Sequence, residues 1–124
     1  MTVERVNYLQ LGLPVGPYTH AVIHGNTLYT SGFTAFGTEA QESSISQQAK
    51  AIFEQLEIIA RAQKTNLENL IKVTIFVTDL MDMAALRNTL SDLYGTQTPA
   101  SSLIKIQGLF APELKIEIEA IFAL

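Results

Sequence analysis

The sequence predicts one α+β domain, in which a mixed β-sheet carries two helices packed on one face. Three observations indicate this fold class. Segments with alternating apolar and polar residues, typical of strands, are interspersed with two segments whose apolar residues recur every three or four positions, as in helices. The length of 124 residues is that of one domain, and no repeat or polar linker divides it. Residues 1–124 are therefore expected to form a single domain.

The first predicted element is a β-hairpin over residues 20–31. Two alternating runs, residues 21–24 and 27–31, flank the pair Gly25-Asn26. Glycine and asparagine adopt positive φ angles more readily than other residues, and tight two-residue turns between antiparallel strands require such angles. The pair is therefore expected to supply the positive φ angles of the turn.

A helix is predicted to follow the hairpin. Ser44 and Gln47 have the spacing of a capping box at its start. Thr65-Asn66 is expected to close it, because asparagine tolerates the left-handed conformation in which helices often end. The apolar residues between these points form one stripe at helical spacing, which predicts the face that packs on the sheet: Ala49, Ile52, Phe53, Leu56, Ile59 and Ala60.

Another strand and a second helix come next. The second helix is predicted to run from Asp82, which suits an N-cap, to Gly95, a residue typical of the position just past a helix end. The strand is predicted over residues 71–78, where four alternate positions place apolar side chains on one side: Ile71, Val73, Ile75 and Val77.

Two strands, at residues 100–106 and 114–123, are predicted to complete the sheet. In the last strand, one side is apolar and suits a core, whereas the other carries Lys115, Glu117 and Glu119. No helix remains to cover the second sheet face, so a partner subunit is its simplest cover. The charged fraction of 16%, against about 25% in typical soluble domains, favours the same interpretation.

Composition excludes several classes of protein. No apolar run reaches the roughly 18 to 20 residues of a membrane helix, and residues 1–16 lack a signal-peptide core, so a cytoplasmic protein without membrane contact is expected. The absence of cysteine excludes disulfides and cysteine-bound metals. The net charge is −4 and the eight basic residues are scattered, so no nucleic-acid partner is expected.

Two pairs of side chains invite a chemical interpretation. His20 and His24 would lie about 13 Å apart on a strand, at about 3.3 Å per residue, so they are not expected to share a metal ion. Glu117 and Glu119 share a face of the last strand, where a partly buried carboxylate with a raised pKa suits general acid–base catalysis. The alternative is an ordinary solvated face with Lys115 as the partner of Glu117, which the residues alone favour.

Five motifs occur in order along almost the whole chain: Val15-Gly16-Pro17-Tyr18, Leu28-Tyr29-Thr30-Ser31-Gly32, residues 73–80, Thr98-Pro99-Ala100 and residues 115–120. Together these motifs resemble the RidA/YjgF family of imine deaminases. The resemblance implies a chorismate-mutase-like fold and a homotrimer whose sheets form a central barrel, with small-molecule clefts between subunits. It also implies hydrolysis of 2-imino acids to 2-oxo acids and ammonia without a cofactor.

The resemblance further implies the residues of a ligand cleft. Glu117 matches the family's water-orienting catalytic glutamate, and Tyr18 matches its cleft tyrosine. Ser31 and Gly32 match its backbone contact with the substrate, and Asn88 matches an asparagine on its second helix.

The match fails at the family's carboxylate-binding arginine, because Ser101 stands directly after Pro99-Ala100. A serine offers one neutral hydrogen bond in place of a bidentate, charge-assisted pair. The expected loss in binding or rate is about tenfold to more than a hundredfold. Phe33, and Leu103 at a position often held by cysteine, indicate a cleft more apolar than is usual in the family.

Two functions from different classes therefore stay open. One is an imine-deaminase-type hydrolase with an altered substrate, in which Glu117 orients water while Tyr18 and Asn88 shape the pocket. The other is a non-catalytic homotrimer that binds or senses a small ligand. Endoribonuclease activity, which is attached to some relatives, is disfavoured because the sequence offers no basic groove.

Overall fold

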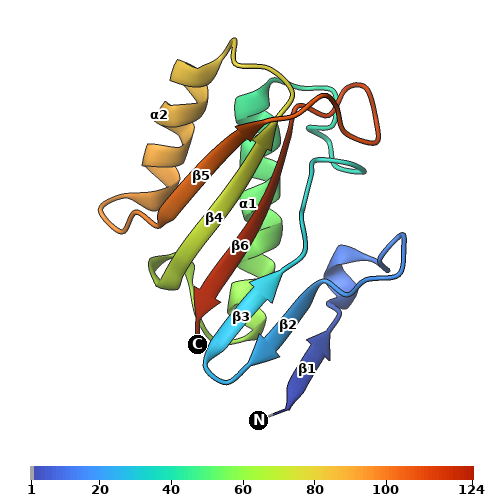
Figure 1. The fold of residues 1–124 in the computed structure, drawn as a ribbon, viewed down its shortest axis with the longest axis vertical. Helices are drawn as coiled ribbons and strands as arrows, with labels where there is room; N and C mark the ends of the chain where they lie inside the picture. Colours follow the sequence, from blue (N-terminus) through green and yellow to red (C-terminus); the bar gives the residue numbers. More distant parts are fainter. Residues whose placement is uncertain (1) are drawn as a thin grey trace.

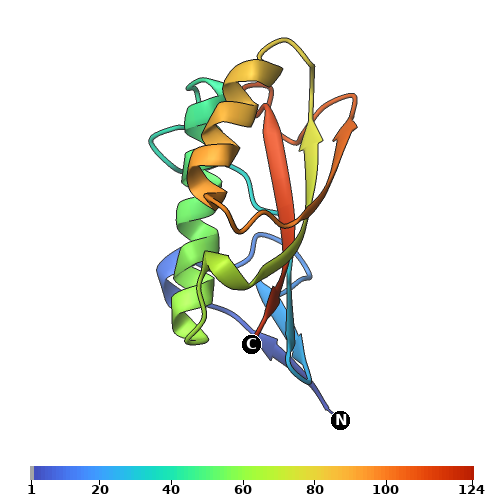
Figure 2. The ribbon, with the colours of Figure 1, turned by 90° about the vertical axis from the view of Figure 1, so that its left-hand side faces the viewer.

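A computed structural model describes residues 2–124 as one mixed six-stranded sheet with two α-helices. The strands have the order β1-β2-β3-β6-β4-β5, and β4 and β5 are parallel while the other neighbours are antiparallel. Both helices cover the same face (Figures 1 and 2), as the sequence predicts. The elements are β1 (Val3–Val6), β2 (Ala21–His24), β3 (Thr27–Thr30), α1 (Ile45–Ala62), β4 (Leu70–Val77), α2 (Met83–Tyr94), β5 (Ala100–Lys105) and β6 (Ile116–Ala123), with 3₁₀ helices at Leu9–Leu11 and Leu67–Asn69.

The predicted hairpin is confirmed as β2 and β3, paired from Ala21 with Thr30 to His24 with Thr27. The expectation for its turn was half wrong. Gly25 has a φ of 63°, but Asn26 does not have a positive φ. A positive φ at the first central residue alone is the mark of a type II′ turn, in which glycine takes that position.

Strand β1 was not predicted from the sequence. It pairs with β2 along the edge of the sheet, from Val3 opposite His24 to Val6 opposite Ala21. Its first three residues are exposed, so it lacks the alternation of buried and exposed positions that identifies a strand locally. Pairing with the hairpin, rather than its own side chains, makes this segment extended.

Helix α1 forms one half of the predicted capping box at its start, and its end differs from the prediction. The Ser44 side chain accepts a hydrogen bond from the backbone N–H of Gln47, and every residue of the predicted stripe is buried. The left-handed residue after the helix is Lys64, with a φ of 60°, and the expectation for Asn66 was wrong. Asn66 instead caps the next 3₁₀ helix by accepting from the N–H of Glu68.

Strand β4 departs from simple alternation at one point. A register shift between Leu70 and Lys72 makes a bulge against β6. As a result Leu70 and Val73 are both buried under the helices, whereas Ile71 is 46% exposed. The prediction that Ile71 shares a face with Val73 is therefore wrong.

The core lies between the sheet and the two helices. Strand β6 contributes Ile116, Ile118, Ala120 and Phe122, all buried as predicted, and α2 contributes Leu86 and Leu90. On the opposite sheet face no helix of residues 2–124 packs (Figure 2). Within these described residues, no helix combines the length and apolar character that crossing a membrane requires.

Candidate functional site

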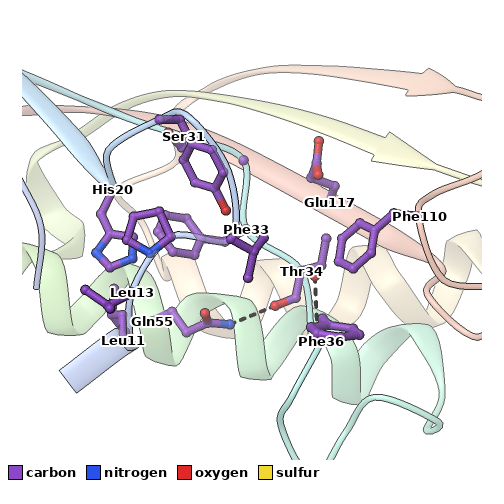
Figure 3. Close-up of a pocket in the computed structure, with 14 residues that line it drawn as sticks. Leu11, Leu13, His20, Ser31, Phe33, Thr34, Phe36, Gln55, Phe110 and Glu117 are labelled. Carbon is purple, nitrogen blue, oxygen red and sulfur yellow. Dashed lines mark hydrogen bonds between the residues drawn. The ribbon is translucent and has the colours of Figure 1, made fainter. Parts of the chain in front are cut away.

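The candidate site is a cavity of about 430 Å³ where four parts of the chain meet. These are the loop before β2, the segment after β3, the β5–β6 loop and the start of β6, with α1 behind them (Figure 3). The lining is mainly apolar, with a few polar side chains and no lysine or arginine. The apolar lining residues are Leu11, Leu13, Pro14, Val15, Phe33, Phe36 and Phe110.

Hydrogen bonds hold the segment after β3 in place on both sides. On one side, the backbone N–H of Ser31 donates to the carbonyl of His20 and the Ser31 hydroxyl donates to the carbonyl of Thr19. On the other, Phe33 and Ile118 exchange two backbone hydrogen bonds of 2.9 and 3.0 Å. The segment therefore runs beside β6, and Gly32 faces Glu117 there.

Glycine at position 32 leaves room for the carboxylate of Glu117, and the backbone there has no positive φ that would itself favour glycine. A Cβ atom on Gly32 would lie 2.8 Å from both Cδ and Oε2 of Glu117. Real Cβ atoms do not approach other heavy atoms so closely, so any other residue would displace the carboxylate. The glycine thus lets the carboxylate of Glu117 lie directly over the backbone of the segment.

The environment of Glu117 favours proton exchange. Burial raises the pKa of its carboxyl group above the usual value, and the charge of Glu119 on the same strand face raises it further. The expected ion pair with Lys115 is wrong, because Lys115 Nζ donates to the carbonyl of Ser43 over 2.8 Å. No side chain within residues 2–124 donates a hydrogen bond to the Glu117 carboxylate, which is therefore available to a ligand or water.

Five of the residues that the sequence singled out line this one cavity: Tyr18, Ser31, Gly32, Phe33 and Glu117. Tyr18 is exposed at its mouth, whereas Phe33 is buried in its wall. In the described part of the chain, no group of three or more histidine or acidic side chains is placed to hold a metal ion.

The other three predicted site residues lie outside the cavity in this chain. Asn88 is exposed on α2, and Ser101 and Leu103 are exposed on the edge strand β5. The sheet register separates them from Glu117. Ser101 is opposite Val73 and Leu103 is opposite Ile75, so both are on the helix side of the sheet. Glu117 is opposite Phe76, on the other side.

Several lining residues were missed because only tertiary structure brings them here. Phe36 and Phe110 make an edge-to-face pair across the cavity rim, with ring centroids 4.9 Å apart. Gln55 of α1 donates from Nε2 to the carbonyl of Thr34 over 2.8 Å (Figure 3). His20, considered from sequence only as a metal ligand, is buried in the wall. No local sequence signal identifies these positions.

Proteins with similar sequences and structures span most of this chain. The family model described as endoribonuclease L-PSP matches residues 10–124. A RutC family protein of Pyrococcus abyssi is 30% identical over 111 residues, covering 87% of each chain. A 2-iminobutanoate/2-iminopropanoate deaminase of Dermatophagoides farinae is 28% identical and covers 87% of this chain and 86% of its own. RidA from an Antarctic Psychrobacter species has a TM-score of 0.81 at 31% identity, covering 90% of this chain and 92% of that one.

Proposed function

This chain belongs to the RidA/YjgF family, whose family model is described as endoribonuclease L-PSP, and on that premise we propose that its cavity binds and hydrolyses a small imine or enamine. The products are a carbonyl compound and ammonia, and no cofactor takes part. The observation that carries this proposal is the Glu117 carboxylate, which has a raised pKa and lies over Gly32 in a largely apolar cavity. The deaminase of Dermatophagoides farinae, similar over 87% of this chain, supports the reaction class.

In the proposed reaction Glu117 acts as general base and then as general acid. The carboxylate accepts a proton from a water molecule as the water oxygen adds to the carbon of the C=N bond, and the carboxyl group passes this proton to the imine nitrogen. In the resulting carbinolamine, Glu117 takes the hydroxyl proton as the C=O bond forms and gives it to the nitrogen, which leaves as ammonia when the C–N bond breaks. A carboxyl group with a pKa above the usual range exchanges protons near neutral pH more readily than a solvated one does.

We further propose that the complete cleft forms between subunits of a homotrimer. The family resemblance assigns Glu117 and Ser101 to one cleft, but within a single chain they occupy opposite sides of the sheet. Two chains that meet along their sheets would bring β5 of one to the cavity of the other. The sheet face without helices supplies apolar surface for such contact, since Tyr29 and Ile104 are each 44% exposed.

A second candidate function, ligand binding without turnover, is favoured by one observation. No lysine or arginine lines the cavity, and Ser101 occupies the position of the arginine that the family resemblance assigns to the substrate carboxylate. A carboxylate substrate would therefore lose a charge-assisted hydrogen-bonded pair. The protein would then be a trimer that binds a carbonyl or imine compound and passes on a signal. Cleavage of RNA has no such support in this lining.

A turnover assay tests the proposal. Imines are generated in situ from several apolar amino acids by an amino-acid oxidase, and the rate of imine loss is measured with and without the protein. We expect the wild type to accelerate hydrolysis of at least one imine, and Glu117→Gln to reduce that acceleration by about a hundredfold or more, since general acid–base groups contribute 10²- to 10⁴-fold.

Glu119→Gln is the matched control, because Glu119 shares the strand face of Glu117 but is exposed and does not line the cavity. It should keep most of the activity. Hydrolysis that is no faster than in buffer, together with saturable binding of the carbonyl products, would reject catalysis and select the second candidate.

A further inference from the structure

His20 is a polar side chain of the cavity wall that the proposed hydrolysis does not use. It lies directly before β2 with 3% of its surface exposed. Its ring stacks on Tyr8 with centroids 6.1 Å apart and also contacts Phe33, with centroids 5.9 Å apart. Figure 3 shows the imidazole next to Phe33 and Leu13. These neighbours hold the ring in one orientation.

Hydrogen bonds fix the tautomer of this ring. The backbone N–H of Tyr8 donates to Nδ1 of His20 over 3.0 Å, so Nδ1 carries no proton and the ring proton is on Nε2. The backbone of His20 is held as well, because its N–H donates to Asn7 Oδ1 over 2.9 Å. A second ring proton would set two N–H groups against each other, and burial lowers the pKa of the imidazole. His20 is therefore held neutral.

The Nε2–H group of His20 has no hydrogen-bond partner in the described part of the chain, residues 2–124. In the same range, the Tyr94 hydroxyl is the one side-chain polar atom that is both fully buried and unpartnered. Nε2 is thus not sealed in the core, and because His20 lines the cavity, this nitrogen opens into it.

We propose that His20 determines specificity, its Nε2–H donating a hydrogen bond to a neutral acceptor, such as a carbonyl oxygen, on an otherwise apolar ligand. The inference rests on the proposed function only for the location of the ligand. A neutral acceptor suits this site better than an anion, because the lining has no cation and Glu117 contributes negative charge. One such hydrogen bond is expected to change affinity about two- to tenfold.

Nuclear magnetic resonance can measure the tautomer directly, because the chain has only two histidines. The imidazole nitrogens are labelled with ¹⁵N, and His24→Asn assigns the signals, since His24 is exposed at the far end of β2. We expect an unprotonated Nδ1 and a protonated Nε2 for His20. Acetophenone should move the Nε2 proton downfield. α-Methylstyrene, which has a methylene group in place of the carbonyl oxygen, should not.

Affinity gives the second measurement. The ratio of the affinity for acetophenone to the affinity for α-methylstyrene should be about two- to tenfold larger in the wild type than in His20→Phe. His20→Gln, whose amide also donates, should retain part of the preference. If His20→Phe fails to fold, the wild-type spectra still decide.

Any one of four results would overturn the inference: a proton on Nδ1, an Nε2 proton that acetophenone does not shift, the same preference for acetophenone over α-methylstyrene in wild type and His20→Phe, or binding of neither probe. These measurements do not depend on turnover. Failure of imine hydrolysis would therefore count against the proposed function and leave the role of His20 to be decided by the spectra.

Discussion

At the scale of single residues, hydrogen bonding separates buried polar groups that support the fold from those that face a ligand. Gln48 is fully buried; its Nε2 lies within hydrogen-bond distance of three carbonyl oxygens, and its Oε1 accepts from the N–H of Lys115. These bonds fix the loop that leads into β6. Glu117, two residues beyond Lys115, is half-buried with no such partner. An unpaired carboxylate is costly to the fold, which favours a functional reason for its presence.

Tyr94 is a different case, because its hydroxyl is buried without a partner and away from the cavity. Burial raises its pKa to about 12. Its ring packs edge-to-face on Phe53, with centroids 5.6 Å apart, between α1 and α2. We expect Tyr94→Phe to raise the free energy of unfolding by about 1 kcal/mol, because it removes an unsatisfied buried group and keeps the ring.

Tyr8→Phe is the matched control, since the Tyr8 hydroxyl accepts a hydrogen bond from Gln63 Nε2 over 3.0 Å. It should lower the free energy of unfolding by about 1 kcal/mol. Urea denaturation of both variants tests the pair. Equal destabilisation in the two would show that the Tyr94 hydroxyl has a partner in the folded protein.

At the scale of elements, the sequence predicted the helices and strands whose formation is determined by their own local residue pattern. The hairpin has its own turn residues, α1 has a capping serine and an apolar stripe, and β6 alternates through its whole length, so the presence and type of these three elements were correctly predicted. The bulge in β4 arises from pairing with β6, and β1 is a strand because it pairs with β2. The local sequence therefore predicts neither the bulge in β4 nor the existence of β1.

The residues of the candidate site also divide into those that sequence motifs predicted and those that only tertiary packing brings together. The motifs of the family resemblance identified Tyr18, Ser31 to Phe33 and Glu117, which the fold brings together. His20, Gln55 and Phe110 were missed as lining residues, because they come from distant segments that only tertiary packing unites. The predicted residues on α2 and β5 lie outside the cavity of a single chain.

The bulge in β4 makes a direct prediction about two isoleucines of one strand. Ile75 is 1% exposed beneath the helices, so Ile75→Ala should lower the free energy of unfolding by about 2 to 5 kcal/mol. Ile71→Ala should change it by about 0.5 kcal/mol or less, because the bulge leaves Ile71 exposed. Thermal or urea denaturation checks both variants. Similar large losses for the two would mean that β4 alternates without a bulge in solution.

At the scale of the whole molecule, the two faces of the sheet have different roles. One is covered by α1 and α2 (Figure 2). The other combines apolar residues with the carboxylates of β6. The association that we propose through this second face would account for the exposure of Tyr29 and Ile104 in a chain with only 16% charged residues. It would also bring the cavity of one chain to residues of β5 of another, which lie on the opposite side of their own sheet from Glu117.

The mass in solution provides a first check of this assembly. We expect light scattering to give three times the 13.6 kDa of the chain at micromolar concentration. Within that trimer, Ser101→Arg should increase hydrolysis of 2-iminopropionate, because the added guanidinium can hold the substrate carboxylate while Glu117 acts on the imine carbon.

The central claim is that Glu117 of one chain and β5 of another form one site, and mixed trimers test it most directly. Wild-type chains are co-expressed with chains that carry both Ser101→Arg and Glu117→Gln, and 2-iminopropionate hydrolysis is measured. Mixing wild type with Glu117→Gln alone is the control. The mixed trimers should be faster than the weighted sum of the two homotrimers, because an arginine from one chain then faces Glu117 of its neighbour. A rate equal to that sum, in mixed trimers of confirmed composition, would contradict the claim.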